Sequence, residues 1–189
     1  DGRSYHLPQP FMVLATQNPV EYQGTFPLPE AELDRFAICV SLGYPSEEDE
    51  LRIIYGAQVR NAERLLPVAE ADDILLVQRQ VSKIHVEREV AMYILAIVTA
   101  TRNNPEIALG ASPRASIMLY RMSQARALYM GREYVMPDDV KALAPCVLGH
   151  RLILSREAKI SGRKITEIFG GIMEKVQAPS FRHAVPQFG

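Results

Sequence analysis

The apolar residues of this chain follow two different patterns, and the change between them lies near Tyr44. Before it, residues 11–15 and 37–42 form two short runs that are almost entirely apolar, each followed by a turn. Such runs are typical of strands that are buried on both faces. After it, apolar residues recur at spacings of three and four, which is typical of one face of a helix. We therefore predict a mainly α-helical chain with a domain boundary near Tyr44.

The part before the boundary, residues 1–44, has the pattern of the end of an α/β core. Between the two predicted strands, residues 29–35 carry the proline and the early acidic residues of a short helix start. Two strands cannot bury both of their faces, so we expect their sheet partners to lie outside this chain. Because the sequence also begins at Asp1 rather than at a methionine, we interpret it as a fragment of a longer protein.

The part after the boundary, residues 45–189, is predicted to be a small antiparallel helical bundle. Ser46 is followed by four acidic residues, which favours a helix start, and Pro113 and Pro137 mark two others. Gly131 is placed to end a helix. Besides the helix after Ser46, the predicted helices cover about residues 72–84, 87–102, 113–130, 137–148 and 166–176.

Charge and hydrophobicity exclude some classes of partner. The chain has 21 basic and 22 acidic residues, so no overall field attracts nucleic acid or anionic lipid. Arg114 and Arg121 share a helix face, with Arg126 and Arg132 nearby, but no aromatic residues alternate with them, and we expect no nucleic-acid partner. The longest nearly uncharged apolar stretch, residues 90–100, is about half of a membrane span, so no span is expected.

The two cysteines have apolar neighbours in the sequence. This favours reduced, buried thiols in Cys39 and Cys146, and with them a cytoplasmic location. Cys146 and His150 are four residues apart and could share a helix face, but two ligands do not make a zinc site. We therefore predict a structural pair and no metal site.

The sequence lacks the parts that bind and cleave a nucleotide. No glycine is followed by lysine, so there is no phosphate-binding loop. No apolar run ends in adjacent acidic residues, so the usual carboxylate that holds magnesium is missing as well. We expect this chain alone not to hydrolyse ATP.

Asn18 and Arg35 are candidate functional residues near the ends of the predicted strands. The amide of Asn18 follows the first strand, where it could orient a water or a phosphate oxygen. The alternative is a turn residue before Pro19. Arg35 lies at an element end, where its guanidinium can project outward. The alternative is a solvated pair with its neighbour Asp34.

Arg114 is the third candidate. It lies near the start of the helix that begins at Ser112, where a cation opposes the helix dipole. This placement predicts an anion nearby, because free backbone amides and an arginine together form an anion site. The alternative is that Arg114 pairs with an acidic residue such as Glu106.

Several blocks of the sequence closely resemble the MoxR family of AAA+ ATPases. The resemblance covers nearly the whole chain, and the blocks occur in the family's order. They are ATQNP (15–19), GTFPLPEA (24–31), LDRF (33–36), LGYP (42–45), ATR (100–102), GASPRA (110–115), GR (131–132), VMPDDV (135–140) and HRL (150–152).

The resemblance implies roles for the three candidates. Asn18 would be the sensor-1 asparagine that positions the attacking water, and Arg35 would be the arginine finger that reaches the γ-phosphate of a neighbouring subunit. Arg114 would be sensor 2, which contacts the nucleotide from a helical lid. Residues 1–44 would then be the end of the AAA+ core, and residues 45–189 the lid.

The resemblance also implies a function for the longer protein. It would be a ring, expected to be a hexamer, that uses ATP and Mg²⁺ and couples hydrolysis to the assembly or activation of client complexes. A von Willebrand A-domain protein would be its partner. Two alternatives are a non-enzymatic interaction module and a magnesium-chelatase-type subunit. The sequence of residues 24–29 favours MoxR over the second.

Overall fold

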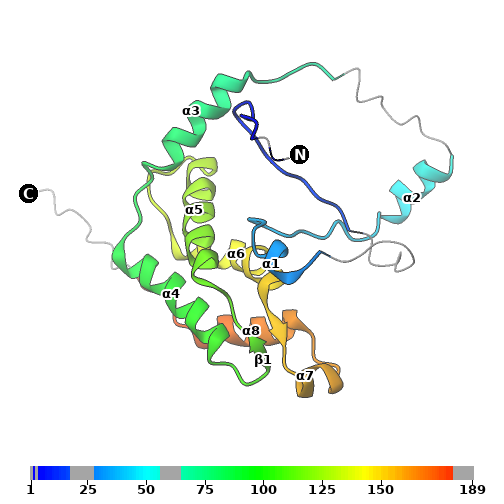
Figure 1. The fold of residues 1–189 in the computed structure, drawn as a ribbon, viewed down its shortest axis with the longest axis vertical. Coiled ribbons are helices and arrows are strands. Elements are labelled where there is room, and N and C mark those ends of the chain that lie inside the picture. Colours follow the sequence, from blue (N-terminus) through cyan, green and yellow to red (C-terminus); the bar gives the residue numbers. More distant parts are fainter. Residues whose placement is uncertain (1, 3, 18–27, 56–64, 181–189) are drawn as a thin grey trace, which may run out of the picture. The chain divides into compact units, whose positions relative to one another are not determined.

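The computed structural model describes residues 2, 4–17, 28–55 and 65–180 (Figure 1). The chain divides into two compact units, one made of residues 1–15 and 40–78 and the other of residues 16–39 and 79–189. This division interleaves the two parts of the sequence, whereas the hydrophobic pattern suggests a single boundary near Tyr44, which stays a prediction.

The seven helices expected from the sequence are all present, so the prediction of a mainly helical chain is confirmed. Their ends differ from the predicted ones by a few residues at most. They are α1 (Glu30–Leu33), α2 (Glu47–Ile54), α3 (Ala71–Val81), α4 (Arg88–Arg102), α5 (Pro113–Tyr129), α6 (Pro137–Leu148) and α8 (Ile165–Lys175).

The two predicted strands are not formed. Residues 11–15 and 37–42 belong to no helix or strand, and the side chains of Leu14 and Leu42 are 82% and 97% exposed. A strand needs a neighbouring strand to satisfy its backbone N–H and C=O groups. Neither run has a strand partner among the described residues, so its apolar content alone does not produce a strand.

Local sequence signals account for the first helix of the smaller unit. Ser46 precedes α2, and its Oγ accepts a hydrogen bond from the backbone N–H of Asp49 at 3.2 Å. The four acidic residues of the first turn lie at the positive end of the helix dipole. Both features stabilise α2 where the sequence predicts it.

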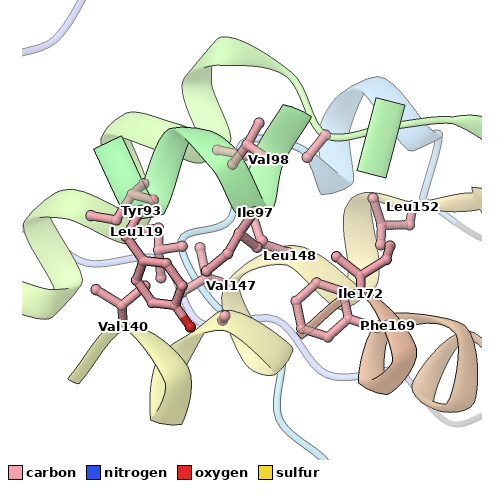
Figure 2. Close-up of a cluster of buried hydrophobic side chains, with 14 of the residues drawn as sticks. Tyr93, Ile97, Val98, Leu119, Val140, Val147, Leu148, Leu152, Phe169 and Ile172 are labelled. Carbon is pink, nitrogen blue, oxygen red and sulfur yellow. The ribbon is translucent and has the colours of Figure 1, made fainter. Parts of the chain in front are cut away.

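The core of the larger unit lies between α4, α5, α6 and α8. One face of α4 is fully buried, and its members are those that the spacing of three and four selects: Val90, Tyr93, Ile94, Ile97, Val98 and Thr101. Figure 2 shows Ile97 of α4 near Leu148 of α6, with Phe169 and Ile172 of α8 in the same cluster. Burial of this cluster holds the four helices together.

Four short elements were not predicted. They connect the helices, and their two strands form an antiparallel pair in which Ile107 is opposite Leu154. The elements are β1 (Ile107–Leu109), the 3-10 helix η2 (Gly149–Arg151), β2 (Ile153–Leu154) and α7 (Arg156–Ile160). The pair ties the segment before α5 to the segment after α6. None of the helices formed by the described residues is long and apolar enough to cross a bilayer.

Candidate functional site

The carboxylate of Asp34 is the centre of the candidate site. Asp34 directly follows α1. Ser112 Oγ donates to it and lies 3.2 Å from both of its oxygens. Arg114 Nη1 lies 3.4 Å from Oδ2, and Arg151 Nε lies 3.1 Å from Oδ1. One carboxylate thus joins the end of α1 to the start of α5 and to η2.

The start of α5 has no side-chain cap. Ser112 is the residue before the helix, but its side chain accepts no hydrogen bond from the first turn. Its hydroxyl instead donates to Asp34. The first N–H groups of α5 therefore lack a side-chain acceptor from Ser112, and such groups favour an anion.

Arg114 is the second residue of α5 and its side chain is 52% exposed. The anion that the sequence predicts beside it is Asp34. This pair also fits the alternative of an arginine paired with an acidic residue, although the acid is not Glu106, which pairs with Arg163 at 2.9 Å. A 3.4 Å pair with a half-exposed arginine stabilises the fold by about 0–1 kcal/mol at most. A stronger anion could therefore replace Asp34 as the partner of Arg114.

The loop before α5 is fixed by the end of α4. Thr101 Oγ1 accepts from the N–H of Ala111 at 3.0 Å and donates to the carbonyl of Val98 at 2.6 Å. Arg102 Nε donates to the carbonyl of Ala111 at 2.8 Å. A Cβ at Gly110 would lie 2.7 Å from the Cα of Arg102, so only glycine fits there. The sequence blocks 100–102 and 110–115 are thus one structural unit that places Arg114.

Arg35 lies in the turn after α1 and is exposed. Its side chain makes no hydrogen bond or ion pair with any residue that the structure describes. The backbone on either side of it is held by Arg151, whose side chain is 1% exposed. Nη2 of Arg151 donates to the carbonyls of Asp34, at 3.2 Å, and of Phe36. Nη1 donates to the carbonyl of Ala37 at 3.3 Å.

Two further contacts hold the segment after Arg35. Nε2 of His150 lies 3.2 Å from the carbonyl of Phe36, and the N–H of Cys39 donates to the carbonyl of Cys146 at 2.9 Å. A carbonyl only accepts, so Nε2 of His150 carries the proton. Residues 34–39 are therefore attached along their length to the end of α6 and to η2.

Burial shifts the pKa values of His150 and Arg151. It lowers the pKa of His150, an effect that the neighbouring charge of Arg151 reinforces and the contact with Phe36 opposes. His150 is therefore neutral near pH 7. Burial also lowers the pKa of Arg151, and Asp34 opposes this shift. Arginine nevertheless keeps its proton in proteins, so Arg151 is a buried cation paired with Asp34.

The two cysteines differ in burial. Cys146 is half-buried, but Cys39 is exposed, so the expectation of two buried thiols is wrong for Cys39. The reason is that residues 37–42, which include Cys39, form no buried strand. In the described part of the chain, no three His, Cys, Asp or Glu side chains are grouped as metal ligands.

Two of the arginines considered for nucleic-acid binding are engaged in the fold. Arg132 donates to both oxygens of the buried Asp139, at 2.8 and 2.6 Å, and Arg126 lies 3.3 Å from the same carboxylate. These ion pairs join the end of α5 to the start of α6. They favour a structural interpretation of Arg126 and Arg132.

Sequence reasoning missed two members of the site. It considered Asp34 only as a possible solvated neighbour of Arg35 and gave Arg151 no role, although both lie in blocks of the family resemblance. No local pattern marks either, because their contacts span 117 positions. Asn18 lies outside the residues that the structure describes, so its role stays a prediction.

Comparison with known proteins assigns both sides of this site. Residues 1–38 match the ATPase family associated with various cellular activities (AAA), and residues 99–169 match the AAA lid domain. The chain is 37% identical over 199 residues, 100% of its own length, to Chaperone MoxR1 of Mycobacterium tuberculosis, of which it covers 52%. The chain belongs to the MoxR family of AAA+ ATPases.

Two further proteins are similar to nearly the whole chain. The chain is 45% identical to the uncharacterized protein YeaC of Bacillus subtilis, over 98% of its own length and 58% of that protein. A solved crystal structure of a candidate ATPase from Cytophaga hutchinsonii is similar with a TM-score of 0.83 and 35% identity, over 93% of this chain and 56% of that one. The chain thus spans about half the length of the relatives that it matches.

The contacts of Asp34 join residues of the two segments that match the family models. Asp34 and Arg35 fall in the AAA segment, whereas Ser112, Arg114 and Arg151 fall in the lid segment. The carboxylate of Asp34 therefore links the MoxR AAA segment to the MoxR lid.

Proposed function

We propose that this chain supplies the nucleotide-sensing residues and the lid of a longer MoxR protein that hydrolyses ATP. The observation that carries the proposal is the start of α5. It has no side-chain cap, and its Arg114 is held only by a 3.4 Å pair with Asp34, next to the exposed Arg35. An exposed cation beside free helix N–H groups suits a phosphate ligand.

Cations at this site would act on the transferred phosphoryl group. Phosphoryl transfer is accelerated mainly by positioning and by stabilising negative charge, because the protein forms few covalent bonds in it. Arg114 would contact the nucleotide of its own subunit. Arg35 would approach the γ-phosphate of the neighbouring subunit, and Asn18 would orient the attacking water.

Mg²⁺ bound to ATP would neutralise part of the phosphate charge. The described residues include no group of acidic side chains that could hold the ion. The chain also contains no glycine-lysine loop. We therefore assign the main contacts to ATP and Mg²⁺ to the rest of the longer protein, and we expect this chain alone not to hydrolyse ATP.

Binding of ATP would change the partner of Arg114. The triphosphate carries more negative charge than Asp34, and Asp34 holds Arg114 only weakly. Arg114 would therefore leave Asp34 for the nucleotide, whereas Ser112 and Arg151 would keep their contacts with this carboxylate.

The family resemblance supports further parts of the proposal. The longer protein would form a ring of identical subunits, expected to be a hexamer, and would assemble or activate client complexes together with a von Willebrand A-domain protein. A cytoplasmic location belongs to the same proposal. Light scattering of the longer protein with ATP would test the ring, with a single hexamer-sized species expected and a monomer contradicting it.

Titration of ATP onto the longer protein tests the role of Arg114. Arg114→Ala removes one charge-assisted contact, so ATP affinity should fall about 10- to 100-fold. Arg121→Ala is the matched control, because Arg121 is exposed on the same helix and should leave affinity unchanged. Equal affinities in all three proteins would contradict the proposal for Arg114.

A further inference from the structure

Arg151 has no part in the nucleotide chemistry proposed above, yet it touches the backbone on both sides of Arg35. Its guanidinium is almost completely buried, with 1% of the side chain exposed. It donates to the carbonyl of Asp34 on one side and to the carbonyls of Phe36 and Ala37 on the other. Arg151 also pairs with the Asp34 carboxylate at 3.1 Å.

A guanidinium suits this arrangement because its N–H groups are fixed in one plane. When it binds carbonyls before and after a residue, it fixes the path of the backbone through that residue. The side chain of Arg35 has no partner among the described residues. The backbone that Arg151 holds therefore fixes the position of the Cα of Arg35 and the direction in which its side chain leaves the backbone.

Arg151 itself lies in the lid segment and also contacts it. Nη1 donates to the carbonyl of Val147 in the last turn of α6. The adjacent His150 contacts the carbonyl of Phe36 at 3.2 Å, and both residues lie in the lid segment. A movement of α6 and η2 would therefore be transmitted to residues 34–37.

We propose that Arg151 is a positioning residue for Arg35, and that through Arg151 the lid sets the direction in which Arg35 points. The proposal rests on the function proposed above, in which Arg35 acts on the γ-phosphate of a neighbouring subunit. It differs from a purely structural role of Arg151 because it makes the effect of Arg151 depend on Arg35.

Arg151→Lys tests this dependence in the longer protein. Lysine keeps the positive charge beside Asp34 but cannot reach the three carbonyls in one plane. Displacement of a catalytic group by an ångström can lower a rate by about 100-fold, so we expect a fall of that order in kcat. ATP affinity should change little, because Arg151 makes no hydrogen bond to Arg114, the proposed nucleotide contact, and lysine keeps the positive charge beside Asp34. Arg163→Lys, at the exposed lid pair with Glu106, is the matched control and should leave kcat unchanged.

The decisive comparison uses protein that already carries Arg35→Ala. In Arg35→Ala protein, adding Arg151→Lys should cause no further loss of kcat, because there is no finger left to position. An equal loss in both backgrounds would show a structural role and overturn the proposal, as would normal kcat of Arg151→Lys with Arg35 present. Normal kcat of Arg35→Ala alone would instead refute the proposed role of Arg35.

His150→Ala gives the same test from a milder change. It removes the contact with the carbonyl of Phe36 while leaving the Arg151 ion pair in place. It should lower kcat only when Arg35 is present. This variant keeps the comparison decisive if Arg151→Lys does not fold, and an equal loss with and without Arg35 would again overturn the proposal.

Discussion

The carboxylate of Asp34 lies 3.4 Å from Nη1 of Arg114, although the two residues are 80 positions apart in the sequence. The same carboxylate pairs with the buried Arg151 at 3.1 Å. One acidic residue of the AAA segment therefore holds two arginines of the lid segment, one of them weakly and exposed, the other buried. Arg114 can therefore exchange Asp34 for another anion, whereas Arg151 supports the fold.

Asp34→Asn should destabilise the chain. The change leaves the buried charge of Arg151 without its carboxylate, and breaking a buried ion pair costs about 3–5 kcal/mol. Because the Asp34 side chain is 24% exposed, we expect the lower end of this range. Urea unfolding measures the change. Asp138→Asn, at an exposed pair with Lys141, is the control and should change the free energy of unfolding by about 0.5 kcal/mol or less. Equal effects of the two changes would contradict this account of Asp34.

Thr101→Val should weaken the loop that carries Arg114. Valine keeps the shape of the buried side chain but cannot accept from the N–H of Ala111. An unsatisfied buried donor costs about 1–3 kcal/mol in the free energy of unfolding. Thr101→Ser retains the hydroxyl and should be less destabilising than Thr101→Val when both are unfolded in urea. If the serine variant is the less stable of the two, the lost methyl group and not the hydrogen bond controls this site.

The pair of Arg132 and Asp139 should make stability depend on acid pH. Burial raises the pKa of Asp139, but the hydrogen bonds from Arg132 and from the N–H of Met136, together with the charges of Arg132 and Arg126, outweigh burial and lower it. A carboxylate with a lowered pKa contributes stability that is fully present above its ordinary pKa of about 3.9. This contribution is lost as the pH falls through the lowered value.

Urea unfolding of the unmodified chain and of Asp139→Asn, measured from neutral to acid pH, tests the sign of this effect. Near neutral pH the variant should be less stable by about 3–5 kcal/mol, since Asp139 is buried. The gap should narrow below about pH 4 as Asp139 takes up a proton. A gap that stays constant down to the acid end would mean that the ionised carboxylate is not what stabilises the pair.

Local sequence patterns predicted the helices because a helix is defined by contacts within a few positions. The buried face of α4, from Val90 to Thr101, follows directly from the spacing of its apolar residues. The same reasoning failed for residues 11–15 and 37–42, which have the composition of buried strands. A strand depends on partners elsewhere in the chain, and composition does not show whether they are present.

The candidate site was predicted only in part, because some of its contacts are local in the sequence and others are long-range. A cation near the start of α5 opposes the helix dipole, and this local fact indicated an anion beside Arg114. Which anion fills that place is a long-range fact, since Asp34 is 80 positions away. Arg151 could not be found in this way, because its partners are backbone carbonyls 114 to 117 positions away, and such carbonyls have no sequence signature.

Steady-state ATP turnover by the longer protein tests the central claim most directly. Arg35→Ala should lower kcat by about 10³- to 10⁵-fold, the range found when an arginine finger is removed. Arg114→Ala should also lower turnover, whereas the control Arg121→Ala should not. Turnover that remains at the unmodified rate in both Arg35→Ala and Arg114→Ala would contradict the claim that these two arginines act on ATP.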